Sequence, residues 1–219
     1  MTIGSQLLNL AQIETAPAEP GIYAWYYVQV ISERDLSDLN DGLLKEEDEA
    51  KRRKLLQDFL LRNVFRAFVS PPYNAEMKGP LAPLFSGQLE HHQEVSESLL
   101  DRLCAAPERL RAIKRVLEAA VPEFASPIYI GMTDNLRRRL CTHKSLIERY
   151  RAAEVFITDA ASTDDETKRD HSFAREVSER KFSVNGLRVA IRSIEGQASE
   201  QADVENVLNR INFPICGRK

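Results

Sequence analysis

Three stretches of the chain carry the hydrophobic pattern of β-strands. Residues 21–31 form a continuous aromatic and β-branched run, which predicts a strand covered on both faces. Residues 128–130 form a shorter run that Gly131 ends. Residues 187–191 alternate apolar with basic side chains, which predicts a strand with one buried face.

Helices are predicted between and after these strands. Apolar side chains recur at helical spacing in residues 5–13, 46–68, 95–103, 107–120 and 199–213. A further helix should begin after Gly131, capped by Thr133 or Asp134. Residues 160–170 are polar and predict an exposed loop, and residues 173–180 predict a short helix. The Pro- and Gly-rich residues 73–87 predict an irregular segment or a small hairpin.

Composition narrows the class of protein. The chain has 219 residues, 43% of them hydrophobic, which suits one domain with a substantial insertion. No apolar run approaches the ~20 residues of a membrane span, and the first residues lack the order of a signal peptide. We therefore expect a cytoplasmic protein with no membrane partner. Three widely spaced cysteines indicate free thiols.

The net charge of the chain says little about function, but the charge of one segment does. The net charge of −3 gives no support to generic nucleic-acid binding. Residues 134–151, however, hold six basic and two acidic side chains. Counting by four from Gly131 gives Asn135, Arg139 and His143, which share one helix face beside the strand that presents Tyr129. This pattern favours chemistry on a phosphate, and its plainer alternative is a solvated charged face.

Two tripeptides extend this interpretation. Gly21-Ile22-Tyr23 and Tyr129-Ile130-Gly131 resemble the two halves of the GIY-YIG nuclease signature. The residues that follow match that family's spacing: Asn135-Leu136, then Arg139, then His143 one helical turn later. Glu205, nine residues before Pro214, matches the family's metal-binding glutamate. The resemblance covers residues 20–31 and 127–217.

The resemblance implies an α+β fold, with a small central, mostly antiparallel sheet flanked by helices. It divides the chain into a nuclease domain of residues 1–31 and 123–219 and a mainly helical insertion of residues 32–122. The two motif strands of this family usually have a short connection, whereas 105 residues separate Tyr23 from Tyr129 here. The insertion is expected to shape access to the site or to mediate self-association, as in a homodimer.

The resemblance also implies an activity, metal-dependent hydrolysis of DNA phosphodiesters by an endonuclease. Tyr23 would be the general base, its proton drawn toward His143, and Tyr129 would position the water or the phosphate. Arg139 would stabilise the transition state, and Glu205 would be catalytic as the ligand of one Mg²⁺ or Mn²⁺. Because a tyrosine in water has a pKa of about 10, Tyr23 can act as a base only if neighbouring positive charge favours its phenolate.

The remaining expectations concern DNA contacts and alternatives. The nucleic-acid-binding residues are expected to be Asn135, Arg137, Arg138 and Lys144. Tyr23 and Tyr129 have a structural alternative, as packed strand residues with bonded hydroxyls. Many family members carry an asparagine three residues after the proline, where this chain has Gly217. The alternative function is therefore a weak or inactive scaffold of the same fold that binds nucleic acid or a protein partner.

Overall fold

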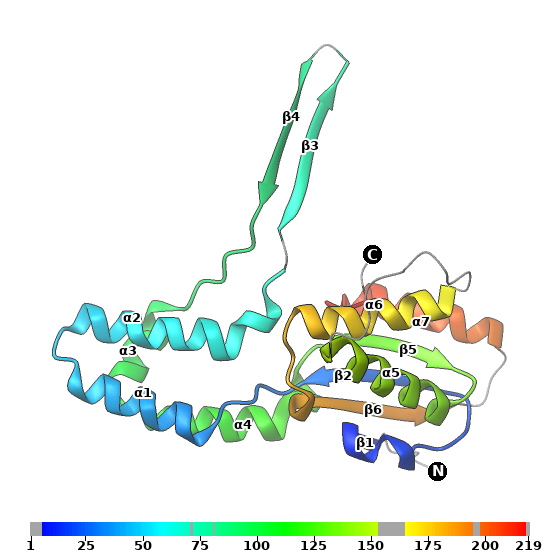
Figure 1. Ribbon diagram of the computed structural model, residues 1–219, viewed down its shortest axis with the longest axis horizontal. Helices are drawn as coiled ribbons and strands as arrows, with labels where there is room; N and C mark the ends of the chain where they lie inside the picture. Colours follow the sequence, from blue (N-terminus) through cyan, green and yellow to red (C-terminus); the bar gives the residue numbers. More distant parts are fainter. Residues whose placement is uncertain (1–5, 71, 81, 153–164, 195–197, 218–219) are drawn as a thin grey trace. The chain divides into compact units, whose positions relative to one another are not determined.

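The computed structural model describes residues 6–70, 72–80, 82–152, 165–194 and 198–217. It is an α+β protein with a four-stranded antiparallel sheet and a separate two-stranded hairpin (Figure 1). The strand order in the sheet is β1 (Gln6–Asn9), β6 (Leu187–Ser193), β2 (Gly21–Tyr27) and β5 (Tyr129–Thr133). The predicted α+β class and the antiparallel sheet are confirmed.

The chain divides into two compact units, residues 1–30 with 113–219 and residues 31–112. The first unit holds the four-stranded sheet and the helices α5 (Leu136–Arg151), α6 (Asp165–Glu179) and α7 (Ala198–Asn212). It also holds two short 3₁₀ helices, η1 (Leu10–Thr15) and η4 (Val184–Gly186). The sequence interpretation put the second junction near residue 122, whereas the contacts place it within α4 (Arg109–Phe124).

Strand β2 is the centre of the first unit, because it pairs with both β6 and β5. Gly21, Tyr23 and Trp25 are buried, while the residues between them are half-buried, so the strand is fully covered on one face only. Helix α5 packs against β2 and β5 (Figure 1). Its apolar stripe faces the core, since Leu136, Leu140 and Ile147 are wholly buried.

The second unit has its own hydrophobic core. The unit is built from α1 (Glu33–Lys45), α2 (Glu49–Leu60), the π-helical and 3₁₀ turns η2 (Leu61–Phe65) and η3 (Arg66–Phe68), the strands β3 (Tyr73–Gly79) and β4 (Ala82–Leu89), and α3 (Glu97–Ala105). Its largest buried cluster draws on the helices, with Leu43, Leu56 and Leu100 almost fully buried. Arg53 joins α2 to α3 by bonding Glu97 and Asp101.

The N-terminal segment differs from its prediction. Residues 5–13 were expected to be an amphipathic helix, but Gln6–Asn9 is a strand paired with β6. The side chain of Asn9 accepts hydrogen bonds from the N–H groups of Ala11 and Gln12, and Gln12 accepts one from the Asn9 N–H. This reciprocal cap begins a new helix at Leu10 and ends the strand before it.

Two other elements also differ from their predictions. Helix α1 was not predicted, although Leu36, Leu39 and Leu43 follow helical spacing. Residues 165–170 belong to α6 and are not loop, while residues 160–164 lie outside the described residues. Residues 73–87 form most of a hairpin with a register shift between Met77 and Gly79, so the second of their two predicted alternatives is confirmed. Across the part of the chain that the structure describes, no helix is long and apolar enough to cross a membrane.

Candidate functional site

The pairing of β2 with β5 brings the two motif strands together. Tyr23 lies directly opposite Gly131, and Trp25 opposite Tyr129. A Cβ atom at Gly131 would lie 2.5 Å from Cζ of Tyr23 and closer still to its hydroxyl. The ring of Tyr23 therefore occupies the space that any larger residue at position 131 would need. This contact gives a physical reason for glycine at the end of the second motif.

Substituting alanine at Gly131 is expected to destabilise the fold by about 1–3 kcal/mol, because the Tyr23 ring must move to admit a methyl group. Chemical denaturation measures the change. The matched control is Gly87→Ala, since a Cβ atom at Gly87 meets nothing within 4 Å. Equal stabilities for the two variants would contradict the close contact at Gly131.

Helix α5 begins at a cap that the sequence interpretation assigned wrongly. Thr133 and Asp134 were the predicted caps, but Asn135 is the N-cap residue, and its side chain accepts a hydrogen bond of 2.9 Å from the Arg138 N–H. Thr133 instead stabilises the turn, because its Oγ1 accepts from the Asn135 N–H at 3.2 Å. The Asn135 side chain, predicted to bind nucleic acid, thus fixes where the helix starts.

From this start, α5 points Arg139 and His143 toward the sheet. Arg139 is buried, and its Nε donates a hydrogen bond of 3.1 Å to the hydroxyl of Tyr23. A guanidinium that donates to a phenol oxygen stabilises negative charge on that oxygen. Two residues 116 positions apart in the sequence therefore meet, as the phosphate interpretation requires.

His143 lies wholly buried inside a ring of aromatic side chains. Its imidazole packs edge-on against Tyr23 and Tyr129, with ring centroids 5.5 and 5.6 Å away. Trp25 stacks on it at 6.1 Å, and Phe173 of α6 lies 5.0 Å away. The cluster combines two phenols, an imidazole and a guanidinium under an apolar cover.

Glu205 reaches the same region from α7. Strand β5 is at the edge of the sheet, and the Met132 N–H donates a hydrogen bond of 3.0 Å to the Glu205 carboxylate. Met132 adjoins Gly131, so the carboxylate lies beside the strand that carries Tyr129. Among the residues that the structure describes, no group of three or more His, Cys, Asp and Glu side chains could hold a metal ion. Among the described residues, a metal at Glu205 would therefore have at most two such side chains as ligands.

The other predicted DNA-contacting side chains lie on the outer face of α5 and already have protein partners. Arg137 Nε donates to the Ala16 carbonyl at 2.8 Å, and Arg138 pairs with Asp134 at 2.8 Å. Lys144 bonds Glu14 at 3.2 Å, and this hydrogen bond raises the pKa of Lys144. Arg137 and Arg138 are exposed, so solvent reaches both guanidinium groups.

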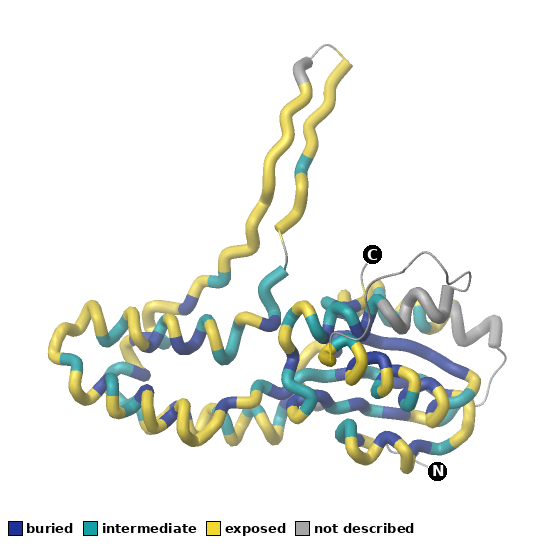
Figure 2. Tube along the Cα trace, in the orientation of Figure 1, coloured by how far each residue is buried: buried dark blue, intermediate teal, exposed yellow. Residues whose placement is uncertain are grey.

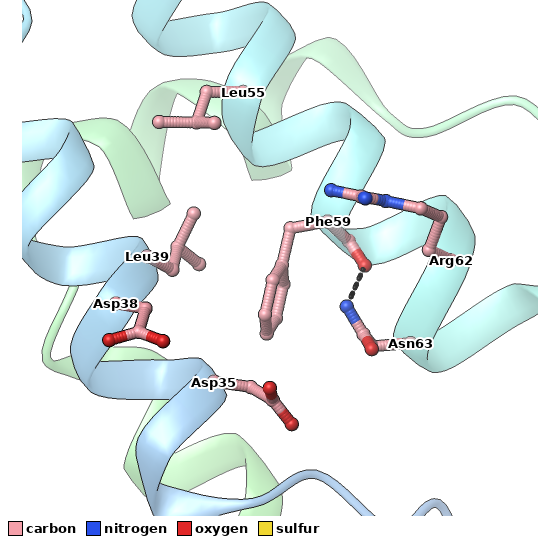
Figure 3. A pocket seen from close by; sticks show the side chains of 7 residues that line it. All are labelled: Asp35, Asp38, Leu39, Leu55, Phe59, Arg62 and Asn63. Atoms are coloured by element: carbon pink, nitrogen blue, oxygen red, sulfur yellow. Dashed lines mark hydrogen bonds between the residues drawn. The ribbon is translucent and has the colours of Figure 1, made fainter.

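A separate groove of about 320 Å³ lies between α1 and α2 in the second unit. Figure 3 shows its lining, in which Leu39, Leu55 and Phe59 are flanked by the carboxylates of Asp35 and Asp38. Arg62 and Asn63 complete it, and Asn63 donates a hydrogen bond of 3.0 Å to the Phe59 carbonyl. The groove contains none of the predicted site residues.

Two side chains that contact the site were not predicted to belong to it. Trp25 was not named as a site residue, although the period of a strand puts it on the same face as Tyr23. Phe173 packs on both Tyr129 and His143, and no local signal marks it because it comes from a different helix.

Comparison of the chain with family models, with curated proteins and with solved structures finds no match.

Proposed function

We propose that this protein is a metal-dependent DNA endonuclease whose site and fold resemble those of the GIY-YIG family. The observation that carries the proposal is the buried hydrogen bond from Arg139 to Tyr23, beside His143 and Tyr129. The spacing of the sequence motifs does not require that these four side chains come together. Their meeting in one cluster supports the proposed site.

In this proposal each side chain has a stated task, and Arg139 has two. Tyr23 is the general base that removes a proton from the attacking water, and the Arg139 guanidinium favours its phenolate. His143, packed against the Tyr23 ring, receives the proton that leaves the phenol. Tyr129 orients the water or the phosphate from the neighbouring strand. Arg139 also offers positive charge to the phosphate oxygens as charge develops on them.

The donor set at Glu205 fits a single hard cation. Mg²⁺ and Mn²⁺ accept one carboxylate and keep several waters, and Glu205 presents a half-buried carboxylate at the edge of β5. Such an ion, held by Glu205, would stabilise charge on the phosphate and on the leaving oxygen. The Met132 N–H holds the carboxylate against β5 and so limits where the ion would lie.

DNA is the proposed substrate and partner. Arg137, Arg138 and Lys144 project from the outer face of α5 and would exchange their present partners for phosphate oxygens. An exposed pair such as that of Arg138 with Asp134 is worth about 0.5 kcal/mol or less, so a phosphate can displace it easily. Asn135 contributes to this surface by fixing the start of the helix.

A second candidate function is a binding scaffold without catalysis. The observation that favours it is burial, since Tyr23 is 1% exposed, Tyr129 5% and Arg139 8%. A phosphate can touch these groups only if neighbouring side chains move. In the scaffold alternative, the Arg139–Tyr23 hydrogen bond and the aromatic cluster serve the stability of the core.

An experiment that measures binding and cleavage together separates the two functions. The wild-type chain is incubated with plasmid and with branched duplex DNA, with and without Mn²⁺, while binding is followed by gel shift. The nuclease proposal expects cleavage that requires the metal. Binding of nucleic acid without cleavage of any DNA or RNA would favour the scaffold.

Gly217 allows a test by gain of function. None of the glycines described in the structure has a positive φ, so the backbone at position 217 accepts other residues. A Cβ atom there would lie 2.9 Å from Pro214 Cγ, so the proline ring must shift slightly, and 3.4 Å from Asn209 Oδ1. That Oδ1 is buried and has no hydrogen-bond partner among the described atoms, so a new amide could donate to it.

We expect Gly217→Asn to raise cleavage at low metal concentration by roughly 10-fold or more, because the amide, oriented by Asn209, would supply one hydrogen bond to the charged phosphate or to the metal's water. The native protein should accordingly work better in Mn²⁺ than in Mg²⁺. Gly217→Ala is the matched control, because it adds the Cβ atom without the amide. If alanine and asparagine have the same effect, the missing amide does not limit activity.

A further inference from the structure

The β3–β4 hairpin has two chemically different faces. Side chains that are directly paired across two strands share a face, and successive residues alternate between faces. One face carries the pairs Tyr73 with Leu89, Ala75 with Gly87, and Met77 with Phe85. It contains no polar side chain apart from the Tyr73 hydroxyl. The opposite face carries the pairs Asn74 with Gln88 and Glu76 with Ser86.

The polar face is suited to water. Gln88 Nε2 donates a hydrogen bond of 3.3 Å to Asn74 Oδ1, and Lys78 pairs with Glu76 at 2.8 Å. Both interactions lie between side chains that project from this face. Leu84, close to the turn, is the exposed apolar exception. The polar face therefore requires no partner.

The apolar face, by contrast, is uncovered. Tyr73, Met77, Phe85 and Leu89 are 62%, 66%, 55% and 63% exposed. A Cβ atom at Gly87 would meet nothing within 4 Å, so the middle of the face is open. Figure 2 shows almost the whole hairpin as exposed. The four large side chains offer roughly 400–500 Å² of accessible surface, the size at which an exposed patch is often functional.

A two-stranded hairpin with an exposed apolar face needs a partner that buries this face. Two strands alone are marginally stable in water, and independent stability takes three or more strands with a buried hydrophobic face. At the base of the hairpin the Ser70 N–H donates a hydrogen bond of 3.0 Å to His91 Nδ1, which ties the two ends together. That bond closes the loop but leaves the apolar face in water.

We infer that the apolar face of the β3–β4 hairpin is a self-association surface that packs against the same face of a second copy of this chain. The face carries no charge, so two copies can approach without like-charge repulsion. A second copy would add two strands and turn one marginal hairpin into two packed layers. A two-fold axis through the level of Ala75 and Gly87 would place Tyr73 and Leu89 against Met77 and Phe85 of the other copy.

Charge argues against nucleic acid as the occupant. Within residues 73–89 the only charged side chains are Glu76 and Lys78, which pair with each other. Binding to phosphates needs a surplus of basic side chains, and this face has none.

The size of the face sets the strength of the association. A specific interface usually buries about 800 Å² per partner, and the hairpin face supplies roughly half of that. We therefore expect a dimer that forms with rising protein concentration in the micromolar range, not a permanent one. This inference does not depend on nuclease activity.

Sedimentation of the full-length chain from about 1 to about 100 µM tests the inference. The wild type should shift from monomer to dimer. Phe85→Lys, which buries an unpaired charge in the interface, should raise the dissociation constant about 100-fold or more. Ser86→Lys is the matched control, because it adds the same charge to the adjacent position on the polar face. It should dimerise like the wild type.

Two results would overturn the inference: a wild type that stays monomeric throughout, or equal weakening of the dimer by Phe85→Lys and Ser86→Lys. If the wild type is monomeric and Phe85→Lys also abolishes its binding to duplex DNA, the face is assigned to DNA. Circular dichroism of each variant guards against misfolding, and Phe85→Ser supplies an uncharged variant that should also weaken the dimer.

Discussion

Replacing Glu205 with glutamine is expected to abolish metal-dependent cleavage while leaving the fold almost unchanged. The glutamine carbonyl can still accept the hydrogen bond from the Met132 N–H, so the contact between α7 and β5 remains. The charge that would hold Mg²⁺ or Mn²⁺ is lost, and it is the only carboxylate that the proposal places on the metal. Cleavage rate, Mn²⁺ binding by calorimetry and thermal unfolding give the three readouts.

Asp203→Asn is the matched control for this variant. Asp203 is an exposed carboxylate on the same helix, two residues before Glu205, and its loss removes the same charge. Native metal binding and cleavage are expected. If Glu205→Gln binds Mn²⁺ and cleaves DNA like the wild type, Glu205 is only the structural acceptor for the Met132 N–H.

Removal of the Arg139 side chain should lower the cleavage rate by about 100-fold or more, because the transition state would lose a fixed positive charge and Tyr23 would lose its donor. Arg139 is buried, so Arg139→Ala should also reduce stability. Arg139→Lys, which keeps the charge without the planar fork, separates these two effects. Single-turnover cleavage and urea denaturation should be measured on the same preparations.

The adjacent Arg138 provides the control. It is exposed and bonded to Asp134, so Arg138→Ala should change stability by about 0.5 kcal/mol or less and reduce only DNA affinity. Equal loss of cleavage at saturating DNA from Arg138→Ala and Arg139→Ala would show that α5 acts through its charge alone. That outcome would remove Arg139 from the catalytic role.

The local parts of the site were predictable from the sequence. Helical periodicity alone put Arg139 and His143 on one face, and a period-two pattern identified β6. That Tyr23 would meet Arg139 could not follow from either pattern, because it depends on how β2 pairs with β5. The resemblance supplied that expectation. The bond from the Met132 N–H to Glu205 was not foreseen, since it joins a strand edge to a distant helix.

Strand β1 was mistaken because short segments take their structure from tertiary partners. Strand β1 has four residues, and its two leucines suit a helix equally well until β6 provides a partner. The hairpin was one of two predicted alternatives, because its prolines and glycines also suit an irregular segment. Helix α1 is different, because Ser32 and the leucines that follow carried a usable signal.

The most direct measurement is cleavage of supercoiled plasmid by the wild-type chain at millimolar Mn²⁺, with an excess of chelator as the parallel reaction. Nicked or linear plasmid should accumulate with Mn²⁺ and form more slowly with Mg²⁺. No such product should form with chelator. Intact plasmid in every reaction, from protein shown to be folded, would contradict the claim that this site hydrolyses phosphodiesters.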